Sequence, residues 1–203
     1  MCWKRWTKIL KGYFGRGVHP QEMAFSLTLP LRRLILSPET LADRLHLNDD
    51  AHVLELGCGP GYFSPEVARR VPHGRLQLFD LQWGMLKAAR GRLGSAAGTN
   101  VSFVQGDACH LPFDAESFDV VFLVTVLGEV SDPAACLQGA YRTLCPGGLL
   151  SNTEQPGDPD FLPPEKVRAL AEAQGFSCVE QFGGGKNYTT NFRKPAVGGD
   201  SQP

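Results

Sequence analysis

Short apolar runs alternate with segments of helical periodicity along most of this 203-residue chain. The runs are rich in valine, leucine and phenylalanine, which is typical of buried strands. They lie at residues 53–56, 76–79, 101–105, 117–127, 176–182 and 188–194, with another after Gly147-Gly148. Strands that alternate with helices form parallel sheets with helices on both faces. The pattern therefore predicts an α/β fold, in which the last run is an antiparallel partner of the run before it.

The stretch from Val53 to Ser64 combines an apolar run, three glycines spaced two apart and the start of a helix. That order predicts a strand, a tight turn and a helix. Glycine tolerates positive φ and lets a ligand approach the backbone, while the helix N-terminus offers free N–H groups. We therefore expect a nucleotide cofactor at Gly57, Gly59 and Gly61.

The details of this turn distinguish between cofactor classes. The dinucleotide pattern Gly-x-Gly-x-x-Gly fails, because Tyr62 or Ser64 occupies its last position. Glu55, two residues before the first glycine, would repel a pyrophosphate but could pair with a cationic amino group. Asp80 closes the second strand 21 residues after Gly59, where an acid reaches the ribose hydroxyls of a nucleotide. An NAD-linked oxidoreductase would share Asp80 but would leave Glu55 without a role.

The sequence Glu-x-Gly-x-Gly-x-Gly at residues 55–61 resembles the first motif of the class I S-adenosylmethionine-dependent methyltransferases. Gly-Asp-Ala at 106–108, followed by Leu-Pro-Phe, resembles the adenine motif of that family, and Leu-Cys-Pro-Gly-Gly at 144–148 resembles its turn before the fifth strand. The resemblance covers residues 37–194 and is closest to the small single-domain ubiquinone/menaquinone C-methyltransferase type. It implies a Rossmann-like, seven-stranded, mostly parallel sheet with an antiparallel last strand and helices on both faces.

The resemblance also implies that S-adenosylmethionine is the cofactor. Asp107 and the backbone of Ala108 would then bind the adenine, and Leu81 would cover its edge. The complete set of cofactor-binding residues that we predict is Glu55, Gly57, Cys58, Gly59, Gly61, Asp80, Leu81, Asp107, Ala108 and Leu123. The implied reaction moves the sulfonium methyl group to a small-molecule or lipid-like acceptor by direct displacement. Alignment and a closed apolar site contribute most to the rate of such a reaction.

Two residues are candidates for a catalytic role in that reaction. Glu129 follows the most apolar run, in a loop that in the family faces the methyl group, and an apolar pocket would raise its pKa toward that of a general base. Glu129 could equally cap the helix that begins near Asp132-Pro133, or face water. His19 lies in a segment that matches the position of the family's lid, although a histidine bonded within a turn is the commoner case.

The first 33 residues carry seven lysines and arginines but one glutamate, although the net charge of the whole chain is −1. Within residues 1–17, tryptophans and other apolar residues recur at helical spacing opposite lysines, as in helices that lie on membrane surfaces. The arm could instead pack its aromatic rings on the domain. We divide the chain into a basic, aromatic arm with lid helices (1–36), a methyltransferase domain (37–194) and a disordered tail (195–203).

Composition disfavours several other classes of protein. The six cysteines are scattered without a Cys-x-x-Cys pair, so we expect no metal site, no disulfide framework and a cytoplasmic setting. No apolar run reaches the ~18 residues of a spanning helix, and the N-terminus lacks a signal-peptide core. The balanced charge makes a nucleic-acid substrate unlikely. A non-catalytic S-adenosylmethionine-binding protein stays open as an alternative, and the sequence leaves the acceptor and the oligomeric state undetermined.

Overall fold

The computed structural model describes residues 35–94 and 100–196. The predicted arm, nearly all of the predicted lid with His19, and the tail from residue 197 lie outside the described residues. The predictions for these segments therefore stay predictions. Within the described ranges, helices and strands follow one another in the alternation that the apolar pattern predicted.

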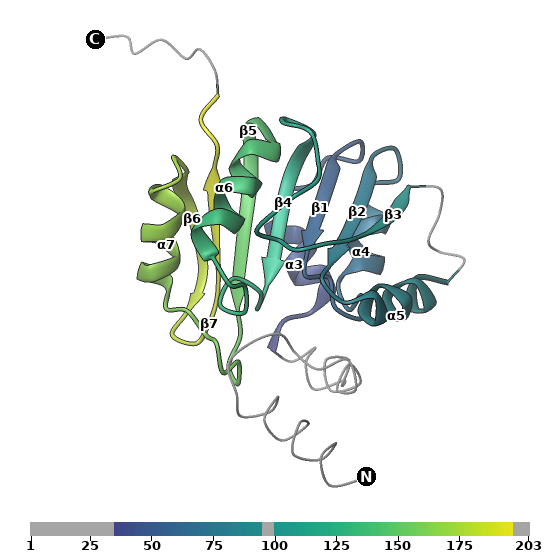
Figure 1. Cartoon of the computed structure of the whole chain (residues 1–203), viewed down its shortest axis with the longest axis horizontal. Helices are drawn as coiled ribbons and strands as arrows, with labels where there is room; N and C mark the ends of the chain where they lie inside the picture. Colours follow the sequence, from purple (N-terminus) through teal and green to yellow (C-terminus); the bar gives the residue numbers. More distant parts are fainter. Residues whose placement is uncertain (1–34, 95–99, 197–203) are drawn as a thin grey trace, which may run out of the picture.

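The described residues contain one seven-stranded sheet, with the strand order β3-β2-β1-β4-β5-β7-β6 (Figure 1). Its strands are β1 (His52–Leu56), β2 (Arg75–Asp80), β3 (Val101–Gln105), β4 (Phe118–Val124), β5 (Leu144–Glu154), β6 (Ser177–Gly184) and β7 (Asn187–Arg193). β7 runs antiparallel to both of its neighbours, and the other pairs of neighbours are parallel. The predicted Rossmann-like sheet with an antiparallel last strand is confirmed.

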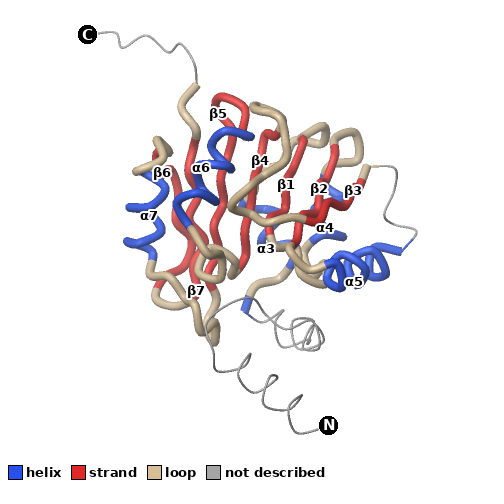
Figure 2. Tube along the Cα trace, viewed as in Figure 1, coloured by secondary structure: helices blue, strands red, loops and turns tan. Residues whose placement is uncertain are grey.

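Helices cover both faces of this sheet, as the alternation predicted (Figure 2). They are α3 (Pro38–Arg44), α4 (Ser64–Arg70), α5 (Trp83–Leu93), α6 (Pro133–Thr143) and α7 (Pro164–Glu172). α6 and α7 contact β5, β6 and β7, whereas α4 and α5 contact β2 and each other. Each face has its own cluster of buried apolar side chains. Alternate apolar side chains of β1 and β4 point into the two clusters, so these central strands are apolar apart from His52, Glu55 and Asp119.

The topology leaves a crevice at one edge of the sheet. From β1 the chain continues to β2 on one side, and from β4 it continues to β5 on the other. In open α/β sheets such a reversal places the ligand site outside the carboxyl ends of the strands. Leu56 of β1 aligns with Phe79 of β2 and with Leu123 of β4. The loops that follow these three strands therefore meet.

One predicted strand ends earlier than the sequence suggested, for a backbone reason that recurs after α3. The apolar run predicted a strand as far as Leu127, but β4 ends at Val124 because Thr125 has a φ of +55°, which a strand does not accommodate. His46, two residues after the end of α3 at Arg44, likewise has a φ of +48°. In both places a non-glycine residue in the left-handed region turns the chain.

Candidate active site

A cavity of about 290 Å³ opens at the carboxyl ends of β1 to β4. This volume is close to the lower end of the range of roughly 300–1,000 Å³ for small-molecule sites. Its lining comes from the loops after these strands and from the start of α5. The predicted cofactor-binding residues in this lining are Glu55, Gly57, Cys58, Gly59, Asp80, Leu81, Asp107 and Ala108. Residues that are far apart in the sequence are thus brought to one site.

The glycine turn after β1 lines the cavity through Gly57 and Gly59, both of which have positive φ. A Cβ at Gly57 would collide with Val126, so the missing side chain lets the loop after β4 pack against the turn. The Gly57 N–H also donates to the Phe79 carbonyl oxygen at 2.8 Å. The turn is therefore fixed to β2 and to the loop after β4.

Asp80, the last residue of β2, stabilises the glycine turn through a hydrogen bond to its backbone. One carboxylate oxygen accepts a hydrogen bond from the Gly59 N–H at 2.9 Å, and the other accepts one from the Gln82 N–H at 2.8 Å. Burial raises the pKa of Asp80, and these two donors oppose the rise. A carboxylate oxygen has two lone pairs. Each oxygen of Asp80 can therefore still accept a hydrogen bond from a ribose hydroxyl.

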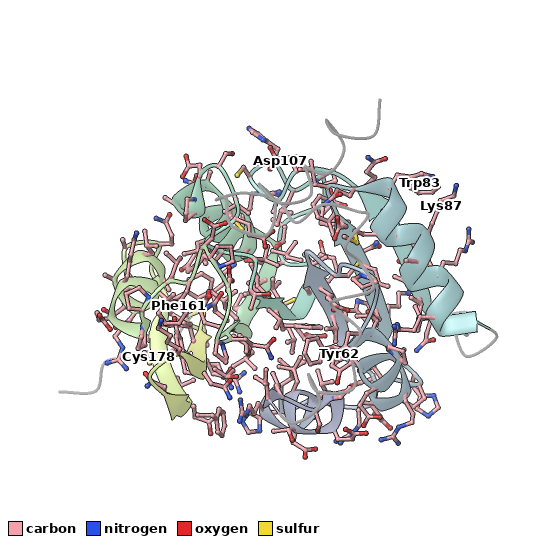
Figure 3. All side chains as sticks on the ribbon, turned by 90° about the horizontal axis from the view of Figure 1, so that it is seen from below. Tyr62, Trp83, Lys87, Asp107, Phe161 and Cys178 are labelled. Carbon is pink, nitrogen blue, oxygen red and sulfur yellow. The ribbon has the colours of Figure 1, made fainter. Side chains whose placement is uncertain are left out.

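The Gly-Asp-Ala motif follows β3 at the same edge of the sheet. The Gly106 N–H donates to the Asp80 carbonyl oxygen at 3.1 Å, which joins the ends of β2 and β3. Asp107 accepts a hydrogen bond from the Cys109 N–H at 2.9 Å, and this bond lowers the pKa of Asp107. About half of the Asp107 side chain is exposed, and Figure 3 shows it at the edge of the molecule. The Asp107 carboxylate is thus ionised and accessible to a ligand.

The cavity is acidic. It is lined by Glu55, Asp80, Asp107 and Glu129, and no lysine, arginine or histidine is among the described residues of its lining. Glu55 is buried and accepts a hydrogen bond from the Ser64 hydroxyl at 2.7 Å. A cleft lined by charges of one sign attracts ligands of the opposite sign. A cationic ligand therefore fits this cavity better than one that carries a pyrophosphate.

The loop after β4 contributes Thr125, Val126, Glu129, Val130 and Ser131 to the lining. The Glu129 N–H donates to the Val126 carbonyl oxygen at 2.9 Å, which closes a turn within this loop. Gly128 lies so close to the Asp160 carbonyl oxygen that a Cβ would not fit. The loop therefore packs on the segment that follows β5. It brings Val126 and Val130 into the cavity lining together with Glu129.

Sequence reasoning missed Thr125. A φ of +55° puts this β-branched residue in the left-handed region, a conformation that costs about 1–3 kcal/mol. Its N–H donates to the Thr153 carbonyl oxygen at 2.8 Å, and its hydroxyl donates to the Val124 carbonyl oxygen at 2.7 Å. No pattern in the sequence signals this turn, because the apolar run continues past it to Leu127.

Residues 53–148 match the model of a family described as "Methyltransferase domain". The chain is 38% identical over 134 residues to the ubiquinone/menaquinone biosynthesis C-methyltransferase UbiE of Haemophilus ducreyi, an alignment that covers 65% of this chain and 50% of that protein. The crystal structure of a SAM-dependent methyltransferase from Aquifex aeolicus aligns with a TM-score of 0.79 at 19% identity, over 86% of this chain and 98% of the other. The chain resembles the class I methyltransferases that use S-adenosylmethionine.

Two findings restrict what the resemblance to the class I methyltransferases implies about function. The chain spans about half the length of the curated relatives that it matches. The [4+2]-cyclase SpnF also has this fold, with a TM-score of 0.71 at 19% identity over 81% of this chain and 80% of that one. The fold is therefore shared with proteins of different activity, and function has to be argued from the site.

Two residues predicted to bind the cofactor lie outside the cavity lining. Leu123 packs in the buried cluster that α6 and α7 cover, and its neighbour Val124 lines the cavity instead, because successive side chains of a strand point to opposite faces. Gly61 lies against α5, where a Cβ would meet Ala89. The absent side chain of Gly61 therefore permits close packing of the helix. The ligand contacts of the other predicted residues stay predictions.

The described residues contain neither a candidate metal-binding cluster nor a helix that could span a membrane, and the cysteine of the cavity lining has a raised pKa. Across residues 35–94 and 100–196, no three histidine, cysteine, aspartate or glutamate side chains gather where they could hold a metal ion. In the same ranges, no helix has both the length and the apolar character needed to cross a membrane. Burial raises the pKa of Cys58, which lines the cavity, well above its usual value. Cys58 is thus a neutral thiol at neutral pH.

Glu154, the last residue of β5, is a buried acid that the sequence pattern did not reveal. One of its oxygens accepts a hydrogen bond from the Asn152 amide at 3.3 Å. The other oxygen is buried without a well-formed hydrogen bond, although the Leu162 backbone N–H also opposes the rise of the Glu154 pKa. Burial, with a smaller contribution from the charge of Asp158, raises the pKa of Glu154 to about 7. The chain after Glu154 leads to Asp160, on which the loop after β4 is seated.

We predict that Glu154→Gln removes a pH-dependent loss of stability. Glu154 binds its proton more tightly in the folded chain than in the unfolded chain, where its pKa is near the ordinary value of 4.5. The wild-type free energy of unfolding should therefore contain a component that falls between about pH 4.5 and pH 7, by on the order of 3 kcal/mol, and stays low above pH 7. Urea unfolding at several pH values should show that the variant gains most at about pH 8.

Glu66 provides a control of opposite sign. Its hydrogen bonds with Arg69 and Arg70 lower the pKa of Glu66 to about 2. The stabilisation from Glu66 is therefore present above about pH 4.5 and is lost as the pH falls toward 2. Glu66→Gln should reduce stability at neutral pH and reduce it less in acid. A gain from Glu154→Gln that is equal at every pH would show that Glu154 is not a buried neutral acid.

Proposed function

We propose that this protein is an S-adenosylmethionine-dependent methyltransferase. The observation that carries the proposal is the acidic cavity, which has four carboxylates and no cationic side chain among its described lining residues. S-adenosylmethionine has a sulfonium and an ammonium group and no phosphate, whereas NAD has a pyrophosphate. The matched family model and the similarity to UbiE support the same conclusion.

The lining offers suitable groups for each part of this cofactor. Asp80 would accept hydrogen bonds from the ribose hydroxyls, as acids at this position do in related sheets. Asp107 would accept from the adenine amino group, and the Ala108 N–H would donate to a ring nitrogen. Glu55 would pair with the ammonium group of the methionine part. The bare backbone of Gly57 lets the ligand come close.

Bound in this cavity, S-adenosylmethionine would supply a methyl group made reactive by a positively charged sulfur. A nucleophilic atom of the acceptor displaces the sulfur as the methyl group is transferred, and a site without water favours this loss of charge. Val126 and Val130 would exclude water on the side of the loop after β4. Glu129 would take the proton of an oxygen or carbon acceptor. Alignment in the rigid glycine turn can contribute effective molarities on the order of 10⁵–10⁸ M.

The lining also favours a class of acceptor. Tyr62 and Phe63 line the cavity as an edge-to-face pair with ring centroids 4.9 Å apart. Together with Val126 and Val130 they offer an apolar surface that suits a ring-shaped or lipid-like molecule. The similarity to a ubiquinone/menaquinone biosynthesis enzyme points the same way. We therefore propose a small-molecule or lipid-like acceptor of the quinol type.

A protein that binds S-adenosylmethionine without transferring its methyl group is the second candidate. The cyclase SpnF supports it, because this neighbour shows that the fold serves other reactions. The two candidates share the cofactor site and differ in turnover. Transfer of label from methyl-labelled S-adenosylmethionine to a quinol distinguishes them.

The proposed cofactor is tested by isothermal titration of S-adenosylmethionine, S-adenosylhomocysteine and NAD. We expect micromolar binding of the first two ligands and none of NAD. Asp80→Ala should weaken S-adenosylmethionine binding at least about tenfold, because a ribose contact and the hold on Gly59 are both lost. Asp119→Ala is the matched control, since Asp119 also accepts a backbone N–H, from His52 at 2.8 Å, near the other end of β4. Its affinity should equal that of wild type, and binding of NAD alone would overturn the proposal.

The proposed base is tested by Glu129→Gln. The amide keeps the size of the side chain but cannot accept the acceptor's proton, so turnover should fall by about 10² or more. Binding of S-adenosylmethionine, measured by titration, should change little, because the proposal assigns the cofactor contacts to Glu55, Asp80 and Asp107. Turnover on a quinol at the wild-type rate would leave Glu129 as an ordinary residue of the loop.

We further propose that residues 1–17, which lie outside the described residues, bind membrane surfaces. The support is the basic and aromatic pattern of this segment, which would bring the domain to a lipid-like acceptor. Vesicles that contain an anionic phospholipid should carry the full chain upward in a flotation assay, and a variant that begins at residue 18 should stay behind. Equal and negligible flotation of both proteins would contradict the proposal.

A further inference from the structure

Four buried polar side chains lie on one face of the β5–β7 pair. Asn152 pairs with Thr190, and Glu154 pairs with Tyr188, in the antiparallel register of the two strands. Side chains that pair across strands, or that are two residues apart in a strand, point to the same face. Tyr188 belongs to the apolar cluster that α6 and α7 cover, so all four side chains point into that cluster. Burying polar groups in an apolar layer costs stability unless they are hydrogen-bonded.

This face has more hydrogen-bond acceptors than donors. Buried oxygens of Asn152, Thr190 and Glu154 lack a well-formed hydrogen bond among the described residues. The Tyr188 hydroxyl donates its hydrogen to the Leu162 carbonyl oxygen at 2.6 Å, and the Asn152 amide donates to the other oxygen of Glu154. A carboxylate only accepts hydrogen bonds, whereas a protonated carboxyl group also donates one. The neutral form of Glu154 therefore fits this face better than the ionised form.

The charged groups around Glu154 favour the neutral form as well. Burial is the largest cause that raises the pKa of Glu154 to about 7, and the charge of Asp158, in the segment after β5 (residues 155–162), adds to it. Tyr188 of β7 faces Glu154 as a neutral phenol, and Glu165 at the start of α7 acts on Tyr188. No described lysine, arginine or histidine is among these groups. Glu154 thus changes its charge near neutral pH without a cation to balance it.

The segment after β5 connects this face to the candidate active site. Its Phe161 ring packs edge-to-face on the ring of Tyr188, with the ring centroids 6.1 Å apart (Figure 3). Its Asp160 carbonyl oxygen lies so close to Gly128 that a Cβ there would not fit. Gly128 immediately precedes Glu129, which lines the cavity. A movement of this segment therefore moves the loop that holds Glu129.

We propose that Glu154 is a positioning residue that makes methyl transfer sensitive to pH: its neutral form holds the segment after β5 in place, and its ionised form releases that segment and the loop with Glu129. An ionised carboxylate in an apolar layer needs water. The segment after β5 has no helix or strand, so its movement is the least costly way to admit that water. The effect on turnover rests on the proposed function, whereas the movement itself needs no ligand.

Amide NMR spectra of the protein without ligand, recorded from about pH 5.5 to about pH 8.5, test the movement. The cross-peaks of Gly128, Glu129 and Leu162 should shift with one shared midpoint near pH 7. In Glu154→Gln this midpoint should be absent, because the amide does not titrate. Glu165→Gln is the matched control: it removes an acid of α7 that is not among the groups that shift the pKa of Glu154, so the midpoint should remain.

The pH dependence of turnover tests the consequence for methyl transfer to a quinol. The ratio of Glu154→Gln turnover to wild-type turnover should rise about tenfold between about pH 6 and pH 8, because roughly a tenth of Glu154 is neutral one pH unit above its pKa. This ratio cancels the ionisation of Glu129 and of the quinol, which both enzymes share. Tyr188→Phe loses the bond to the Leu162 carbonyl oxygen but leaves Glu154 to titrate, so its ratio to wild type should be the same at every pH. A merely structural role of Glu154 would give that same constant ratio.

Three outcomes would overturn the inference. If the Gly128 and Glu129 cross-peaks have no midpoint that Glu154→Gln removes, Glu154 does not control the loop, while the proposed function stands. If these cross-peaks titrate as expected but the turnover ratio is constant, the movement does not govern methyl transfer. If the cross-peaks titrate and neither protein transfers a methyl group, the proposed function fails and the pH control of methyl transfer fails with it.

Discussion

The hydrogen bond from the Gly59 N–H to the Asp80 carboxylate is the contact on which the site depends. The glycine turn has positive φ at successive glycines, a conformation that an unsupported chain adopts only as one of many. Asp80 selects it by accepting from Gly59 with one oxygen and from Gln82 with the other. The end of β1, the end of β2 and the start of α5 are thereby fixed relative to one another. The part of the cavity wall that these segments form is therefore preorganised before a ligand binds.

The buried carboxylates in this part of the cavity wall reduce the stability of the folded chain. Burying a carboxylate is unfavourable unless hydrogen bonds or opposite charges compensate for it. Asp80 receives two backbone N–H groups, and Glu55 receives the Ser64 hydroxyl. The cavity lining, as far as it is described, contributes no cation to either acid. The strained Thr125 turn adds a second local cost at the same site. Two local costs to stability thus lie at one cavity, which is the arrangement expected where stability is given up for binding.

The motifs made much of the cavity lining predictable. Glu55, Gly57 and Gly59 are fixed to one another by a contiguous turn, and the position of Asp80 at the end of the next strand follows from the parallel sheet. Leu123 shows the limit of predicting the lining from the sequence. In a strand buried on both faces every position is apolar, so the sequence does not reveal which side chains point toward which layer. The structure places Leu123 in the core and its neighbour Val124 in the lining.

The shape of the loop after β4 could not be predicted, because it depends on contacts between distant segments. The loop after β4 takes its shape from the positive φ of Thr125 and from the approach of Gly128 to Asp160, and neither leaves a pattern in the sequence. The family model ends at residue 148, so it includes that loop but not the segment on which the loop is seated. Two chains with the same cofactor motifs can therefore differ in the segment around residues 155–162 and hold Glu129 differently. The setting of Glu129 in the cavity therefore depends partly on a segment that lies outside the matched family model.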